Sequence, residues 1–145
     1  MDEYIRTKAS YAECLMNLGQ TGHAIDKFES TKTQIENEIV YENPLLFINV
    51  CNQMGNCYLS LAINPQKTAN RIDLFEKALD NFESSLCLIN RMDDKGTDEL
   101  INNVLVGKIC LNIALIRSQL GNHHESVIMH LKSLDHKREQ VANPF

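Results

Sequence analysis

Four histidines lie close together near the end of the chain, and histidine is a common ligand at transition-metal sites. They are His123, His124, His130 and His136. A helical zinc site usually needs two histidines four residues apart, or histidines and cysteines at short spacing. No pair of these histidines has that separation, and no cysteine lies beside them. We therefore expect exposed histidines, with His130 half buried, and neither a bound metal nor another cofactor.

Five cysteines could supply a nucleophile or a disulfide. They are Cys14, Cys51, Cys57, Cys87 and Cys110. Their odd number and the lack of a C-x-x-C pair favour a reducing compartment, so we expect a cytoplasmic protein. Most of them occupy apolar positions of helical patterns, where cysteine packs as a small hydrophobe. Only a fold that places Cys110 against the last helix would create a thiol–histidine pair.

Other catalytic motifs are missing from the sequence. It contains no glycine-rich phosphate loop and no G-x-S-x-G nucleophile motif. Those motifs would place backbone amides around a phosphate, or a serine on a strained turn. The residues therefore favour a protein that is not an enzyme.

The charged residues do not suggest a polyanionic partner. The 145 residues include 14 lysines and arginines and 19 aspartates and glutamates, for a net charge of −5 without a basic stripe. This balance argues against nucleic acid or an anionic membrane as the partner. The most apolar stretch, residues 100–116, is interrupted by asparagines and a lysine and is too polar to cross a bilayer.

Apolar residues recur at steps of three and four along nearly the whole chain, which is the spacing of one face of an α-helix. Gly19 and Gly121 favour helix ends because glycine readily adopts positive φ, and Pro44 favours a helix start. This pattern predicts an all-α fold of six helices in three antiparallel pairs. The pairs span approximately residues 2–38, 44–91 and 97–142.

The same spacing predicts which side chains face the core. The clearest stripe runs through Ile72, Phe75, Leu79, Phe82, Leu86 and Ile89. The predicted stripe of the first helix contains Tyr4, Tyr11, Leu15 and Leu18, and that of the last contains Val127, Leu131, Leu134 and Val141. In the third helix, Met54 and Tyr58 belong to the stripe, so Asn49, Asn52 and Asn56, which share the opposite face, should face solvent.

Small side chains lie where the paired helices would cross. They are Ala12 and Ala24 in the first pair, Gly55 and Ala78 in the second, and Ala114 and Ser126 in the third. With the larger residues Leu15, Phe28 and Phe82 around them, they form a pattern that resembles tetratricopeptide repeats. The resemblance implies an alpha-alpha superhelix, a right-handed stack of helix pairs that forms one repeat domain over residues 1–145.

The spacing between crossing residues is longer than the usual repeat of about 34 residues. It is similar to the long repeats of Pins-type adaptors and rapsyn. The sequence departs from the family pattern because the consensus tryptophan is absent and Lys8 occupies its place in the first pair. An ordinary six-helix bundle is the alternative fold, and three pairs are also compatible with a fragment of a longer solenoid.

In tetratricopeptide repeats the first helix of each pair lines a concave groove, and the resemblance implies which residues would form it. They are Arg6, Glu13, Asn17, Asn49, Asn52, Gln53, Asn56, Lys108, Asn112 and Gln119. The Lys and Asn pattern that clamps a C-terminal carboxylate is not matched, because Ala9 and Glu13 stand in its positions. A merely solvated face is the alternative for this set.

We therefore expect an adaptor that binds a peptide segment of a partner protein in this groove. Asn49, Asn52 and Asn56 share one helix face, where their amides could bond successive peptide groups of the segment. Arg6 and Lys108 at the flanks would favour an acidic segment. The rival expectation is a structural piece that joins other repeats, or a second copy of itself, through its end faces.

Overall fold

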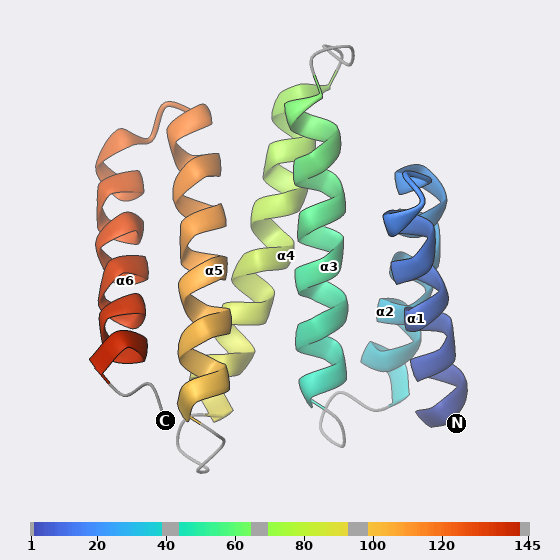
Figure 1. The fold of residues 1–145 in the computed structure, drawn as a ribbon. Helices are drawn as coiled ribbons and strands as arrows, with labels where there is room; N and C mark the ends of the chain where they lie inside the picture. Colours follow the sequence, from blue (N-terminus) through green and yellow to red (C-terminus); the bar gives the residue numbers. More distant parts are fainter. Residues whose placement is uncertain (1, 39–43, 65–69, 93–98, 143–145) are drawn as a thin grey trace. The chain divides into compact units, whose positions relative to one another are not determined.

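A computed structural model of the protein describes residues 2–38, 44–64, 70–92 and 99–142. Within these ranges the chain forms six helices and no strand, so the predicted all-α class is confirmed (Figure 1). The helices are α1 (Asp2–Asn17), α2 (Thr21–Glu38), α3 (Pro44–Ile63), α4 (Arg71–Met92), α5 (Glu99–Gln119) and α6 (His123–Ala142). No helix of the described residues combines the length and apolarity needed to span a membrane.

Two helix ends are formed by the same glycine cap. Gly19 and Gly121 have φ values of 78° and 84°, a region that side chains with a Cβ rarely occupy. The amide of the residue after each glycine donates to a carbonyl five residues earlier, at 2.9 Å for Gln20 to Leu15 and 2.8 Å for Asn122 to Arg117. These bonds satisfy carbonyls that the helix leaves without partners and allow the chain to reverse direction. The predicted stops at both glycines are confirmed.

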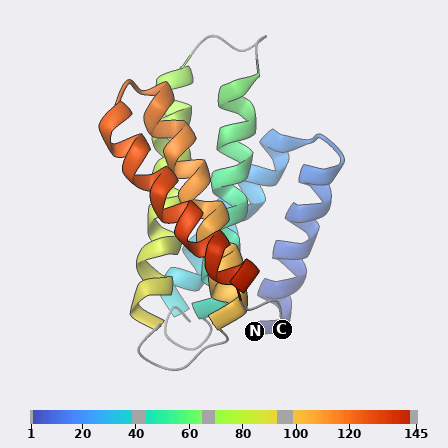
Figure 2. The ribbon, with the colours of Figure 1, turned by 60° about the vertical axis from the view of Figure 1, so that its left-hand side comes forward.

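The chain divides into two compact units, residues 1–85 and 86–145. The boundary falls inside α4, so most of that helix belongs to the first unit. In the first unit, α1 packs against α2, and α3 contacts both of them. Figure 2 shows α1 and α2, in blue, side by side.

The core of the first unit depends on a close approach between α3 and α4. Phe82 is fully buried, and a Cβ added at Gly55 would lie only 2.7 Å from Cε1 of its ring. Ser85 lies one turn further along α4 and donates a hydrogen bond to the Ile48 carbonyl of α3 at 3.0 Å. The predicted contact residues Ala12, Ala24 and Ala78 are also completely buried. Small residues therefore lie where the sequence pattern placed them.

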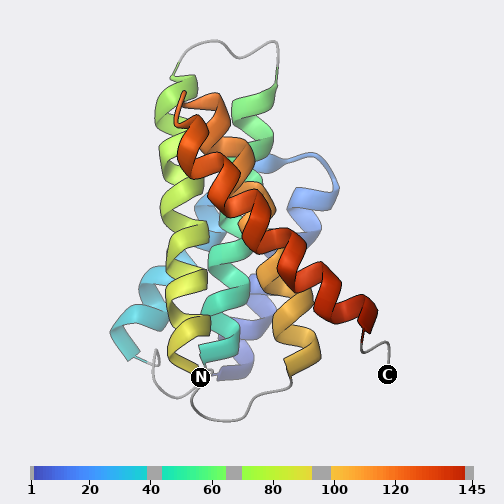
Figure 3. The ribbon, with the colours of Figure 1, turned by 90° about the vertical axis from the view of Figure 1, so that its left-hand side faces the viewer.

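The second unit contains the antiparallel pair α5 and α6, which lie side by side in orange and red (Figure 3). Two serine hydroxyls of α6 donate to backbone carbonyls of α5, Ser126 to Ala114 and Ser133 to Gly107, each at 2.8 Å. A hydroxyl can make such a bond only where the two backbones come close. The predicted crossing at Ala114 and Ser126 is therefore present, and Ser126 adds a hydrogen bond to it.

Part of the predicted core is wrong. Tyr4, Tyr11 and Leu18 of α1, Ile72 of α4, and Val127, Leu131 and Leu134 of α6 are all exposed. Val141 lies outside the side chains that the structure describes. The reason is geometric for α1. Ile5, Ala9 and Ala12 form its buried face, and Tyr4, Tyr11 and Leu18 lie beside that face, where they are exposed to solvent. A broad apolar pattern predicts a helix correctly but does not say which part of it is covered.

Candidate functional site

The seven predicted groove residues of the first unit come from α1 and α3. Gln53 donates a hydrogen bond of 3.5 Å to the Glu13 carboxylate, which joins the two helices at this surface. None of the seven is buried. Arg6, Asn17 and Asn49 are exposed, and the other four, Glu13, Asn52, Gln53 and Asn56, are half-buried. The structure thus brings together a polar surface on α1 and α3.

The other three predicted groove residues, Lys108, Asn112 and Gln119, lie on α5 in the second unit. Lys108 and Gln119 are exposed, and Asn112 is half-buried. Like the predicted groove residues on α1 and α3, these three are exposed or half-buried. A groove that runs over all three helices remains a prediction.

A longer row runs along the exposed side of α3. Its residues follow one another at steps of three and four, and therefore share one face of the helix. They are Leu45, Asn49, Asn52, Asn56, Leu59 and Ile63. Leu45 is 59% exposed and Ile63 is 63% exposed, so the row has an exposed apolar side chain at each end. We call these six residues the α3 row.

Sequence reasoning found only the asparagines of the α3 row. It selected only polar residues for the groove and gave no role to Leu45, Leu59 or Ile63. The sequence does contain the information needed to find the apolar residues. Leu45 lies four residues before Asn49 and Ile63 seven after Asn56, so both share the helix face of the asparagines and not that of Met54 and Tyr58. Apolar residues in a solvent-facing register often mark a binding surface.

A second feature is a hollow of about 390 Å³ on the other side of α3. Its floor contains Met54 and Tyr58. Each follows an asparagine of the α3 row by two residues, Asn52 and Asn56, and therefore points about 200° away from it around the helix axis. One wall comes from α2 and the other from α4. The wall residues are Glu29, Lys32, Thr33 and Glu36 on α2, and Lys77, Asp80 and Asn81 on α4.

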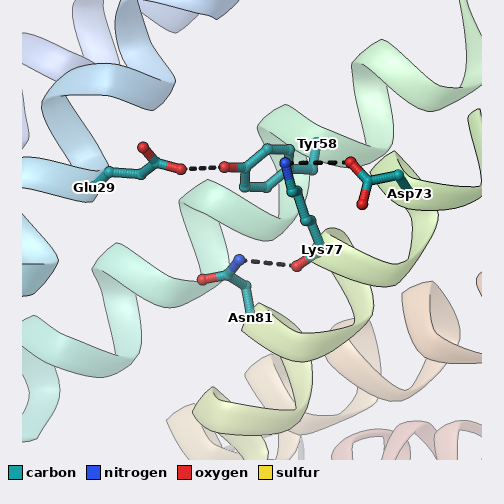
Figure 4. A network of polar contacts seen from close by, with 5 residues as sticks. All are labelled: Glu29, Tyr58, Asp73, Lys77 and Asn81. Atoms are coloured by element: carbon teal, nitrogen blue, oxygen red, sulfur yellow. Dashed lines mark hydrogen bonds and ion pairs between the residues drawn. The ribbon is translucent and has the colours of Figure 1, made fainter. Parts of the chain in front are cut away.

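A polar network holds the floor of the hollow in place (Figure 4). The Tyr58 hydroxyl donates a hydrogen bond to the Glu29 carboxylate of α2. The Lys77 ammonium lies 5.8 Å from the centre of the Tyr58 ring and forms a 3.2 Å ion pair with Asp73. A cation at this distance from an aromatic face is attracted by the ring's electrons. Tyr58 thus links a carboxylate on α2 with an ammonium on α4.

The environment of Tyr58 keeps its hydroxyl protonated. Burial raises the pKa of Tyr58, and the hydrogen bond to Glu29 and the negative charge of that carboxylate raise it further. At neutral pH the hydroxyl is therefore a donor, as the contact with Glu29 requires. The ring is held in a fixed orientation.

Asn81 connects the two walls. Its side chain is almost completely buried, and its amide nitrogen donates to the Lys77 carbonyl at 2.8 Å. Its amide oxygen accepts a 3.3 Å hydrogen bond from the Lys32 ammonium of α2. Both lysines of the hollow therefore have partners within the protein.

The buried thiols are poor nucleophiles. Burial raises the pKa of both Cys51 and Cys57 to about 11, and it also raises the pKa of Cys110. A thiol with such a pKa stays protonated at neutral pH, and the protonated form does not attack substrates. The predicted core packing is correct for these three cysteines, whereas Cys14 and Cys87 are exposed.

The histidines of α6 do not converge on a metal site. His123 and His124 are exposed, while His130 is half-buried and lies with Nδ1 2.8 Å from the Ser126 carbonyl. Among the described residues, no group of histidine, cysteine and acidic side chains could hold a metal ion. The half-buried state predicted for His130 is confirmed.

Comparison with known proteins gives no relative from which a function could be transferred. The chain matches no protein-family model, no curated protein and no solved structure. The α3 row and the hollow must therefore be interpreted from their own chemistry.

Proposed function

We propose that the protein is a non-catalytic adaptor that binds an extended segment of another protein along the α3 row. The observation that supports this proposal is the exposed face of α3, in which amides occupy the middle and apolar side chains both ends. Asparagine can donate and accept hydrogen bonds at once, as a peptide backbone requires. Leu45 and Ile63 would contact apolar side chains of the ligand.

The length of the row sets the length of the ligand. Leu45 and Ile63 are 18 positions apart, which is about 27 Å along a helix at 1.5 Å per residue. An extended peptide covers about 3.3 Å per residue, so about eight residues would span the row. We expect a ligand with apolar residues near both ends and small or polar residues between them.

The likeness to tetratricopeptide repeats supports the same proposal. Ala12, Ala24, Gly55 and Ala78 are all buried, as in that family's helix crossings. We extend the proposal to an alpha-alpha superhelix whose groove includes α1, α3 and α5. Arg6 and Lys108 would then favour acidic residues in the ligand.

Selection from a random peptide library displayed on phage tests the proposal. The full chain should enrich peptides with two apolar positions about six to eight residues apart, because that spacing matches the row. A chain carrying Leu45→Ser and Ile63→Ser should lose this enrichment. Asn90→Ala changes an exposed residue of α4 and should keep it. Absence of a common apolar spacing in the wild-type selection would refute the proposal.

A second function has its own supporting observation. The terminal helices carry large apolar side chains that are each at least 50% exposed. They are Tyr4, Tyr11 and Leu18 on α1, and Val127, Leu131 and Leu134 on α6. Exposed apolar stripes of this kind often mediate association. Light scattering separates the two functions. A protein that assembles through these faces forms oligomers at micromolar concentration, and Tyr11→Ser with Leu131→Ser would return it to a monomer.

A further inference from the structure

We propose that the hollow between α2 and α4 binds an arginine side chain of a partner protein, in a site separate from the α3 row. The hollow has an aromatic floor, carboxylates on its walls and a size that suits one side chain. It does not depend on the proposed function, because Met54 and Tyr58 face away from the asparagines of the α3 row.

The floor suits a cation with an apolar stem. The Lys77 ammonium already lies 5.8 Å from the centre of the Tyr58 ring, so the structure itself places a positive charge at this aromatic surface. A planar guanidinium can stack on a ring more closely than an ammonium can. Met54 and Tyr58 are only 3% and 6% exposed, so the guanidinium would reach the ring by replacing the Lys77 ammonium, which can keep its ion pair with Asp73.

The walls carry more carboxylates than ammonium groups. Glu29, Glu36 and Asp80 line the hollow, against Lys32 and Lys77. Each of these lysines already bonds within the protein, Lys32 to Asn81 and Lys77 to Asp73. Among the side chains that the structure describes, none forms an ion pair with Glu36 or Asp80. The walls thus leave two carboxylates for a cationic ligand.

The arrangement fits arginine better than an anionic ligand. Carboxylates on both walls would repel a phosphate or an acidic side chain, since Glu36 is on α2 and Asp80 on α4. A guanidinium has five N–H donors and can bond more than one carboxylate at once. The hollow of about 390 Å³ is at the small end of the usual range for ligand sites, about 300 to 1,000 Å³. It therefore suits one side chain rather than a large ligand.

Tyr58 would contribute to this site through both its hydroxyl and its ring. Its hydroxyl bonds to Glu29 of α2, and its ring lies against Lys77 of α4. Removing the hydroxyl would loosen the ring, whereas removing the ring would eliminate the surface on which the guanidinium stacks. These two changes should therefore have different effects on binding.

The test is a titration of the full-length chain with acetyl-Gly-Gly-Arg-Gly-Gly-amide, followed by NMR. The matched probe contains citrulline, which has the shape of arginine without its charge. We expect saturable shifts at residues of the hollow with the arginine peptide, and at least tenfold weaker binding with the citrulline peptide. Equal binding of the two peptides would overturn the proposal, and this comparison uses only the wild-type protein.

Variants locate the site. Glu36→Gln with Asp80→Asn should weaken arginine binding at least tenfold, while Glu3→Gln with Asp135→Asn removes two exposed carboxylates elsewhere and should leave it unchanged. Tyr58→Leu should remove the preference for arginine over a lysine peptide, and Tyr58→Phe should retain most of it. Unchanged binding by a folded Glu36→Gln, Asp80→Asn chain would place the peptide somewhere else and overturn the proposal.

Substitutions in the α3 row distinguish this inference from the proposed function. Leu45→Ser with Ile63→Ser should leave the arginine affinity within twofold of wild type. A large loss in that variant would mean that the peptide binds to the α3 row instead, and the proposal for the hollow would be wrong.

Discussion

The two sides of α3 differ in what their side chains touch. On one side Gly55 lies against the Phe82 ring and Tyr58 bonds to Glu29, so neighbouring helices determine the position of each group. On the other side Asn49 is exposed and Asn52 is half-buried. One helix therefore combines a side on which its packing depends with a side that is accessible to other molecules.

This difference teaches where substitutions should affect stability and where they should affect binding. A buried ring loses its contacts and leaves a cavity when it is shortened. An exposed amide exchanges bonds with water and contributes little to folding. The expected change in the free energy of unfolding is therefore largest for Phe82 and smallest for the asparagines of the α3 row.

Phe82→Ala should cause the largest loss. Phe82 is fully buried against Gly55, and Phe→Ala in a core costs about 3 to 5 kcal/mol. Denaturant unfolding followed by circular dichroism measures the change. A loss below about 1 kcal/mol would contradict the burial of this ring, and Phe82→Leu should lose clearly less than Phe82→Ala.

Gly55→Leu should destabilise the same contact by crowding instead of by a cavity. Even a Cβ at this position would lie 2.7 Å from the Phe82 ring, so the ring or the helix must move. Overpacking of this kind costs about 1 to 3 kcal/mol. Gly22→Leu is the control, because a Cβ there meets no atom within 4 Å. Equal unfolding midpoints for the two variants would show that Gly55 does not lie against the Phe82 ring.

Tyr58→Phe should cost about 1 kcal/mol at neutral pH, the net value of one hydrogen bond. The pKa of Tyr58 is raised above its ordinary value of 10.0, so its contribution is complete below pH 10 and declines as the pH rises further. The difference in stability between the wild type and Tyr58→Phe should therefore shrink from pH 9 to pH 11. A difference that stays constant over this range would refute the role of the hydroxyl.

Asn49→Ala with Asn52→Ala should have the smallest effect on stability. Both are on the accessible side of α3, and the melting temperature should remain nearly that of the wild type. Affinity for a peptide selected as above should fall roughly ten- to a hundredfold, since each bond contributes about 0.5 to 1.5 kcal/mol. Melting several degrees lower would instead assign these amides to a structural network.

Much of the fold could be predicted because it depends on short stretches of chain. Gly19 and Gly121 each end a helix through their own backbone freedom, and Pro44 begins one through its fixed φ. Ala12, Ala24, Gly55 and Ser126 could be assigned to helix crossings because only small side chains allow such an approach. These properties belong to single residues and their nearest neighbours along the chain.

The accessible surface was harder to predict. The apolar spacing of Tyr4, Tyr11 and Leu18 is that of a core stripe, yet these side chains are exposed. Periodicity reports the shape of a helix but not the number of neighbours that cover it. The same limit concealed Leu45 and Ile63, which look like core residues until their register along α3 is compared with that of the asparagines.

The sequence by itself therefore determined the helices, their ends and the small residues at their crossings. Only the tertiary structure decided that Glu29, Tyr58 and Asp80 would surround one hollow, because they come from three helices far apart along the chain. Their separations follow from how α2, α3 and α4 pack. A local pattern cannot encode those distances, since they depend on every side chain that fills the space between the helices.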